Sequence, residues 1–411
     1  MSIKEKVLGS DHPNTVTSYN NIGSVYAKQG DYFKALEYYF KALSITEKVL
    51  GLDHPDTATF YNNIGSVYSS QGDYPKSLEY YFKALAIRKK MFGLNHPDVA
   101  TSYNNIGSVY AEQGDYPKAL EYYFKALSIE EKVLGFDHPD TAISYDNIGS
   151  VYSRQGDYPK ALEYYFKALV IREKVFGFDH PDTAASYNNI GLAYSDQGDY
   201  PKSLEYYFKA LAIRKKMFGL NHPDTATYYG SIGTVYFFQD NYSKALEYYF
   251  KTVAILENAF GLNHPDTATY YSYIGYVYEK LKDNSRALAY YSKVLSIREK
   301  ILGLDHPDTI CSYNDVGAMY EVSGEYEKAI QYYSEALVQR RKIYGNEHTE
   351  TSKSYKNIGN VYALHGDYAR ALEYYGKALA IREKILGKDH DDTIAVKQEI
   401  EKINLSLSNQ R

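Results

Sequence analysis

The chain has 411 residues, with 46 Lys and Arg against 51 Asp and Glu, which gives a formal net charge of −5. This balance lacks the basic footprint of a general nucleic-acid binder and the basic clusters of a membrane-surface protein. A single Cys excludes an intramolecular disulfide framework and a Cys-based zinc site. No apolar run approaches about 18 residues and the N-terminus has no apolar signal core, so we expect a cytoplasmic protein.

The 49 Tyr far exceed ordinary usage and indicate that a few positions recur along the chain. Gly51, Gly93 and Gly135 each follow Leu or Phe, and they are spaced by 42 residues. All but one of the 11 His keep the same register. No linker or shift in composition interrupts this pattern. We therefore expect residues 1–411 to form a single repeat array, with nine helix-pair repeats over about 9–386 and a capping helix over about 388–405.

The N-terminal end of the array is expected to be open. Residues 1–8 resemble only the last turns of the second helix of a repeat, so the apolar face of the first helix lacks its usual cover. This pattern predicts either a fragment of a longer array or self-association at the N-terminal end.

The second repeat shows what one unit of the array forms. His54-Pro55-Asp56 is a helix start, because Pro suits the first turn and an anion there is favoured by the helix dipole. Apolar residues then recur every three or four positions, which predicts a helix over about 55–70. Gly72 and Asp73 mark a turn and a cap, and a second helix follows over about 74–90. We call the two helices of each repeat helix A and helix B.

The fold class that follows is all-α. An isolated helix pair cannot bury both of its apolar faces, so the repeats must stack on one another. Successive A helices are expected side by side, on the order of 10 Å apart. The expected architecture is an open superhelix with A helices on one surface and B helices on the other.

These residues resemble the tetratricopeptide repeat. That family's signature places a bulky aromatic, then Leu-Gly and Tyr on helix A, and Ala, an aromatic and Ala on helix B. The first repeat matches it at Tyr19, Ile22, Gly23, Tyr26, Ala35, Tyr39 and Ala42. The 42-residue period and the Leu-Gly-x-Asp-His-Pro-Asp loop are similar to the kinesin-light-chain type. The resemblance implies a right-handed superhelical solenoid and a non-catalytic scaffold that binds a peptide or partner helix in its concave groove.

An Asn pair recurs on helix A, and the resemblance implies that it faces the groove and bonds the backbone of a bound peptide. Amides offer a donor and an acceptor at each step, which suits an extended peptide. The alternative is that the Asn residues bond neighbouring A helices, and the two roles are compatible. The positions are Asn20, Asn21, Asn62, Asn63, Asn104, Asn105, Asn147, Asn188 and Asn189.

Repeats six and seven break the Asn pattern. Gly230-Ser231 and Ser272-Tyr273 replace the pairs, and aromatic residues appear beside them. Exposed aromatics are typical of a binding hot spot, whereas the alternative is local repacking around the bulkier side chains. The candidate hot-spot residues are Phe237, Phe238, Tyr273 and Tyr276.

Repeat nine is locally basic, and two of its residues resemble half of the carboxylate clamp of chaperone-binding family members. It is a candidate site for an acidic segment of a partner through Lys353, Lys356, Asn357 and Asn360.

We expect no catalytic site, cofactor or metal site. The sequence has no phosphate-binding Gly-rich loop, His-Glu-x-x-His motif or nucleophile elbow. Equivalent His in stacked repeats lie too far apart to share a zinc ion, so we interpret them as caps and loop packing. The expected partner is a protein or peptide, with neither nucleic acid nor membrane involved. Alternatives are a structural or self-assembling spacer, or the sensor part of a larger signalling protein.

Overall fold

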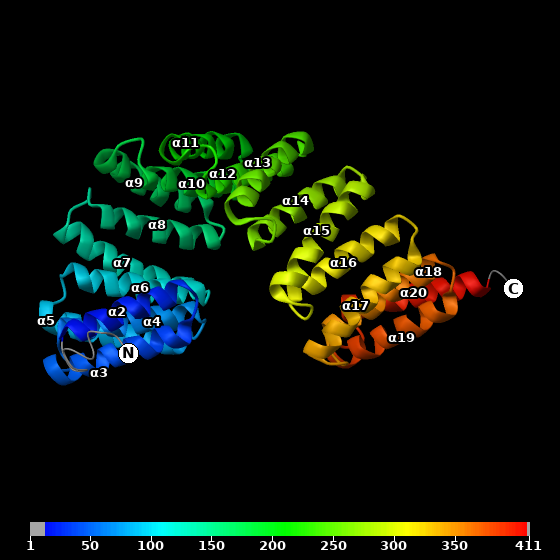
Figure 1. Ribbon diagram of the computed structural model, residues 1–411, viewed down its shortest axis with the longest axis horizontal. Coiled ribbons are helices and arrows are strands. Elements are labelled where there is room, and N and C mark those ends of the chain that lie inside the picture. The colour runs from blue at the N-terminus through cyan, green and yellow to red at the C-terminus, as the bar shows by residue number, and fades with distance from the viewer. Residues whose placement is uncertain (1–12, 409–411) are drawn as a thin grey trace. The chain divides into compact units, whose positions relative to one another are not determined.

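The computed structural model describes residues 13–408, and in this range it consists of α-helices joined by short turns (Figure 1). The helices group into two compact units, of which the first ends at Lys216 and the second begins at Met217. The segment over 1–8, from which an open N-terminal end was expected, lies outside the described residues.

The first compact unit alternates shorter A helices with longer B helices. Its A helices are α2 (Pro13–Lys28), α4 (Pro55–Ser70), α6 (Pro97–Glu112), α8 (Pro139–Arg154) and α10 (Pro181–Gln197). Its B helices are α3 (Tyr32–Leu50), α5 (Tyr74–Phe92), α7 (Tyr116–Val133), α9 (Tyr158–Phe176) and α11 (Tyr200–Phe218), which continues two residues into the second unit. The helix predicted over 55–70 is confirmed, and the one predicted over 74–90 is two residues longer.

The second compact unit continues the same alternation. Its A helices are α12 (Pro223–Phe238), α14 (Pro265–Lys280), α16 (Pro307–Val322) and α18 (Thr349–Leu364). Its B helices are α13 (Tyr242–Phe260), α15 (Asn284–Leu302), α17 (Tyr326–Tyr344) and α19 (Tyr368–Ile385). The expected capping helix is α20 (Asp391–Ser408), which packs against α19. The all-α fold of paired helices is confirmed.

The in-register His residues from His54 onward cap the A helices. His54 Nδ1 accepts a hydrogen bond from the backbone N–H of Asp56 at 3.1 Å, and His96 does the same for Asp98 at 3.2 Å. The His96 ring also stacks on Phe92, with ring centroids 4.4 Å apart. The interpretation of these His as caps and loop packing is therefore confirmed.

The turn between the two helices of a repeat forms as the sequence predicts. Gly72 has a φ of 76°, a left-handed conformation that a side chain would strain. Asp73 follows as the N-cap of α5, where its Oδ1 accepts a hydrogen bond from the Lys76 N–H at 3.3 Å. Helix A thus ends and helix B begins within three residues.

Close packing of the two helices within a repeat depends on Gly at one position of helix A. A Cβ added at Gly107 would lie 2.8 Å from the Tyr123 ring, which is closer than real Cβ contacts. Ile106, beside it, is fully buried. The invariant pairing of helix A Gly with helix B Tyr sets the spacing of the helices, and it accounts for part of the high Tyr content.

Candidate binding surface

The Asn pairs connect consecutive A helices. Asn63 Nδ2 donates to Asn20 Oδ1 at 2.9 Å, and Asn105 Nδ2 donates to Asn62 Oδ1 at 2.6 Å. The second Asn of one repeat therefore bonds the first Asn of the preceding repeat, so the expected bonding between neighbouring A helices is confirmed at these positions. Each bond uses only part of an amide's hydrogen-bonding capacity, because the side chain has two donors and an acceptor with two lone pairs.

The Asn residues of the first compact unit lie on one surface, which we call the A-helix face. They are half-buried, except for Asn21, which is exposed. The structure places them on α2 (Asn20, Asn21), α4 (Asn62, Asn63), α6 (Asn104, Asn105), α8 (Asn147) and α10 (Asn188, Asn189).

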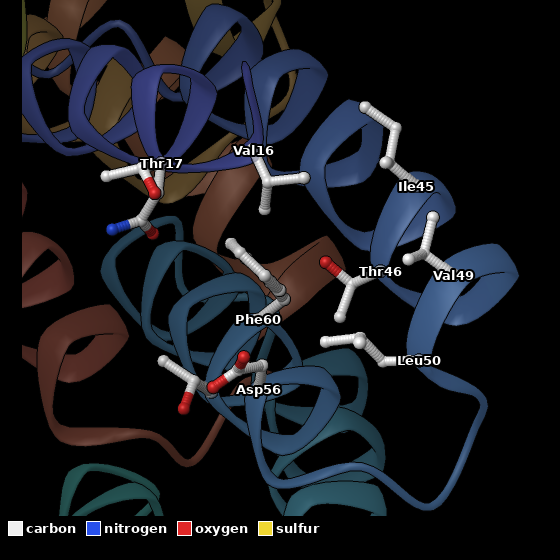
Figure 2. A pocket seen from close by; sticks show the side chains of 10 residues that line it. Val16, Thr17, Ile45, Thr46, Val49, Leu50, Asp56 and Phe60 are labelled. Atoms are coloured by element: carbon white, nitrogen blue, oxygen red, sulfur yellow. The ribbon is translucent and has the colours of Figure 1, made fainter. Parts of the chain in front are cut away.

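A pocket opens on this face between α2 and α4, with the last turns of α3 beneath. Figure 2 shows Val16, Thr46 and Phe60 turned toward one another from these three helices. Asn20 also lines the pocket, together with Val49. Half of the lining side chains are apolar, namely Val16, Ile45, Val49, Leu50 and Phe60, and we call this the apolar pocket.

Pockets of different chemistry occur at equivalent positions further along the chain. Glu130 and Arg340 stand at whole multiples of the 42-residue period from Thr46, and each lines a pocket of its own. The acidic pocket is defined by Glu130, Asn104, Asn105, Asp140 and Asn147. The basic pocket is defined by Arg340, Arg382, Lys353, Lys356, Asn357, Asn314, Cys311, Asp315 and Asp392. The residue in the Thr46 position therefore contributes a different chemical group to each of these pockets.

Where that residue is Arg, it usually bonds a Ser on the next A helix. The Nη1 atom donates to the Ser hydroxyl at 2.8 Å in Arg88–Ser102 and at 2.6 Å in Arg172–Ser186. The second compact unit repeats this at 2.8 Å in Arg340–Ser354. These arginines are buried, so the bond joins two repeats beneath the A-helix face. Our reading of the sequence missed this pair, and its signal was Arg followed by Ser after 14 residues in several repeats.

Arg172 also pairs with an acidic residue that occupies one of the Asn positions of the repeat. Its Nη2 lies 2.5 Å from Asp146 Oδ2, and both side chains are largely buried. Asp146 stands where other repeats carry the first Asn of the pair. A buried carboxylate needs such a partner, because desolvating an unpaired charge is costly.

The basic pocket brings together three of the four residues expected to contact an acidic ligand. Lys353 pairs with Glu350 Oε1 at 2.5 Å, and Asn357 Nδ2 approaches Asn314 Oδ1 at 3.5 Å. Lys356 is half-buried and lines the pocket. The fourth residue, Asn360, lies apart from this lining and accepts a hydrogen bond from the Tyr375 hydroxyl at 2.8 Å.

Acidic side chains lie in the same pocket. Burial raises the pKa of Asp315 to about 6, and the nearby Arg298 partly opposes that shift. Arg382 donates from Nε to Ser352 Oγ at 3.0 Å and from Nη1 to the Asp392 carbonyl at 2.7 Å. The pocket is therefore a mixed site with an excess of basic groups, unlike the acidic pocket of the first compact unit.

Three of the four candidate hot-spot residues, Phe237, Phe238 and Tyr276, form an aromatic cluster on α12 and α14. The Phe237 ring lies 5.4 Å from Tyr276 and 5.8 Å from Phe238. Phe238, Tyr273 and Tyr276 are exposed, whereas Phe237 is half-buried beneath them. Tyr273 instead contacts the buried Tyr249, with the two ring centroids 5.6 Å apart.

Repacking also occurs next to this cluster. Tyr270 occupies the space that Gly230 leaves open, since a Cβ at Gly230 would overlap the Tyr270 hydroxyl. The Tyr270 ring contacts Tyr249 at 6.1 Å and Tyr273 at 5.6 Å. Both sequence interpretations thus have a structural counterpart, with packing around Tyr270 and exposed rings at Tyr276.

Within residues 13–408, no group of three or more His, Cys, Asp or Glu is arranged to hold a metal ion. In the same range no helix is both long enough and apolar enough to cross a membrane.

Comparison with known families identifies the repeat. The tetratricopeptide repeat model matches residues 1–39, 14–90, 98–174, 149–216, 182–258, 224–300, 266–337 and 308–384. The chain belongs to the tetratricopeptide repeat family, whose members are in general scaffolds for protein–protein interaction. The resemblance inferred from the sequence motifs is confirmed. No curated protein matched the chain.

Solved structures share the fold at low sequence identity. A putative kinesin light chain from Podosopora anserina with nearly identical repeats is 23% identical, and the match covers 50% of this chain and 98% of that one, with a TM-score of 0.43. The apo form of RapI is 20% identical over 70% of this chain and 98% of its own, with a TM-score of 0.51. A signal transduction ATPase with a tetratricopeptide repeat sensor from Pyrococcus horikoshii is 17% identical, and the match covers 92% of this chain and 55% of that one, with a TM-score of 0.59.

Proposed function

We propose that the chain is a non-catalytic interaction scaffold whose A-helix face binds an extended peptide segment of a partner protein. The observation that carries this proposal is the amide pair repeated on successive A helices, whose bonds Asn63–Asn20 and Asn105–Asn62 use only part of the amides' hydrogen-bonding capacity. Extended peptides present a backbone donor and acceptor at regular intervals, so a row of amides matches them without requiring one sequence.

Pockets of contrasting chemistry beside the amides support selectivity. Backbone contacts alone bind any extended chain, whereas side-chain pockets distinguish one peptide from another. The apolar pocket around Phe60 and the acidic pocket around Glu130 both open on the A-helix face of the first compact unit.

The test compares capture of partner proteins by the full chain and by a variant with Asn63, Asn105 and Asn189 changed to Ala. The matched control changes Lys83, Lys125 and Lys209 to Ala, since these exposed B-helix residues each pair with a Glu four residues earlier. We expect the Asn variant to lose specific partners identified by mass spectrometry, while the Lys variant retains them. Retention of the same partners by a folded Asn variant would falsify the proposal.

A second contact region is proposed at the aromatic cluster of the second compact unit. Exposed rings held by ring–ring contacts supply apolar area at low entropic cost, which is characteristic of binding anchors. Changing Phe237 and Tyr276 to Ala should weaken partner binding on the order of tenfold or more while helical content is unchanged. Unchanged affinity in that folded variant would assign the cluster to packing alone.

The basic pocket is proposed to take a carboxylate of an acidic partner segment. Lys356 lines it in place of the first Asn of the pair, so a positive charge stands where other repeats offer an amide. Lys356→Asn restores the usual residue, and it should weaken binding of an acidic segment more than binding of a neutral one.

A further inference from the structure

The acidic pocket contains a carboxylate oxygen without a hydrogen-bond partner. Glu130 is only 3% exposed, and its Oε1 accepts a hydrogen bond from Asn104 Nδ2 at 3.1 Å. Its Oε2 is buried and has no partner among the described residues. Burial raises the pKa of Glu130 to about 7, the nearby Asp140 and Glu131 act in the same direction, and hydrogen bonding by Ser144 and Asn104 opposes the shift. An ionised Glu130 is therefore only partly compensated for its burial.

The position of Glu130 in the repeat explains why the partner is missing. The equivalent residue is Arg in repeats two and four, where Arg88 and Arg172 bond the Ser of the next A helix. Repeat three keeps that Ser as Ser144 but replaces the guanidinium with a carboxylate. The side-chain charge at this position is therefore negative instead of positive, while the Ser that Arg would bond is kept.

The surroundings of the pocket are suited to a cation. Its lining adds a second carboxylate, Asp140, whose side chain is 55% exposed, and the amide side chains of Asn104, Asn105 and Asn147; Asn104 Oδ1 already accepts a hydrogen bond from Ser144 at 3.2 Å. Of the described residues that line it, none is basic. Because carboxylate and amide oxygens both accept hydrogen bonds, the pocket offers acceptors to a donor-rich group that carries positive charge.

We propose that the acidic pocket takes the basic side chain, Lys or Arg, of the peptide bound on the A-helix face. This inference rests on the proposed function, since the peptide backbone would be held by the Asn pairs while the side chain enters between α6 and α8. An ammonium or guanidinium group would donate to Glu130 Oε2, which supplies the missing partner and favours the ionised carboxylate. The pocket would then select against acidic side chains by like-charge repulsion.

The experiment selects phage-displayed random dodecapeptides on the immobilised full chain. Three variants are compared with the unaltered protein: Glu130→Gln removes the charge, Glu130→Arg restores the residue of the neighbouring repeats, and Glu121→Gln is the control. Glu121 lies on the same helix, α7, but is exposed and pairs with Lys125 at 2.5 Å. Circular dichroism confirms that each variant keeps its helical content.

We expect peptides selected by the unaltered protein and by Glu121→Gln to share a Lys or Arg at one position. Glu130→Gln should lose that preference and bind a selected peptide on the order of tenfold more weakly. Glu130→Arg should instead prefer the same peptide with Glu in place of the basic residue. A basic preference that survives in both Glu130 variants would overturn this inference and leave the scaffold proposal standing, whereas failure to select any peptide would overturn both.

Discussion

Arg172 Nη1 donates a hydrogen bond to the Ser186 hydroxyl at 2.6 Å, which ties the end of α9 to the middle of α10. Both residues are buried. The bond therefore contributes to the stacking of one repeat on the next, and it also forms part of the base of the A-helix face. The residue at the Arg172 position of the repeat therefore affects both the stacking of the repeats and the chemistry of the A-helix face.

Removing the Ser hydroxyl should loosen that junction. Ser186→Ala leaves a buried guanidinium N–H without its acceptor, at a cost of about 1–3 kcal/mol in unfolding free energy. Urea denaturation followed by circular dichroism measures the loss. Ser70→Ala, at an exposed position near the end of α4, should stay within about 0.5 kcal/mol. An equally small effect at Ser186 would show that the pair contributes nothing to stacking.

Glu130 should make stability depend on pH in a defined direction. Its pKa is about 7 in the folded protein against 4.5 for the free side chain, so between these values the folded state binds the proton more tightly than the unfolded chain. The unfolding free energy therefore falls as pH rises through this interval, by about 2–3 kcal/mol at most. The contribution is complete below the unfolded pKa and absent above the folded one.

The measurement compares the unaltered protein with Glu130→Gln. The difference in urea midpoint should favour the unaltered protein more at about pH 4 than at about pH 8, since other titrating groups cancel in the comparison. A difference that is constant with pH would contradict the assignment. Glu130→Arg should be more stable than the unaltered protein at the higher pH, because it restores a bond to Ser144 like that of Arg88 to Ser102.

Two turns carry a strained residue where the other repeats have Gly. Asp240 and Lys282 adopt φ values of 56° and 59°, in the left-handed region that costs a side chain about 1 kcal/mol. Lys282→Gly should therefore raise the unfolding free energy by up to about 1 kcal/mol, despite the greater freedom of Gly in the unfolded chain. Thermal unfolding of the full chain provides the readout. Gly72→Lys is the reverse exchange at a φ of 76°, and it should lower the unfolding free energy. If neither variant changes the unfolding free energy, backbone strain at this turn position does not affect stability.

Gly230 and Tyr270 should behave as a coupled pair. Gly230→Ala places a methyl group against the Tyr270 hydroxyl and should destabilise the protein by about 1–3 kcal/mol. In a Tyr270→Ser background the same change should be neutral or stabilising, because Ala is the better helix former. A double-mutant cycle measures the coupling, and additive effects would show that the two side chains do not share this space.

Much of the fold can be predicted from the sequence because the repeats carry the same signals for the start and the end of each helix. His54, Pro55, Gly72 and Asp73 fix where helices begin and end, and the structure places those boundaries as expected. The bonding of Asn63 to Asn20 was also foreseen as one of two readings of the Asn pair. A structural position of the repeat can be recognised in the sequence when the same residue type recurs there.

The Arg that recurs near the end of helix B could have been found in that way, but the two pockets of the first compact unit could not. Thr46 and Glu130 depart from that Arg, and nothing in the sequence shows that they line pockets. Their common function appears only once packing shows that the end of helix B reaches beneath two A helices. Likewise, Gly230 stands out in the sequence as a replacement of Asn, but only the structure shows that it makes room for Tyr270.

The apolar and acidic pockets draw their walls from two successive A helices and their base from the B helix between them, as Val16, Thr46 and Phe60 do in the apolar pocket. A recombination event that inserts or removes exactly one period in phase therefore joins the half-pocket of one repeat to the half-pocket of another. New specificities arise in this way without any point mutation, while helix caps and core contacts stay intact. Residues 72–98 and 198–224 are identical in sequence, which is the mark such copying leaves behind.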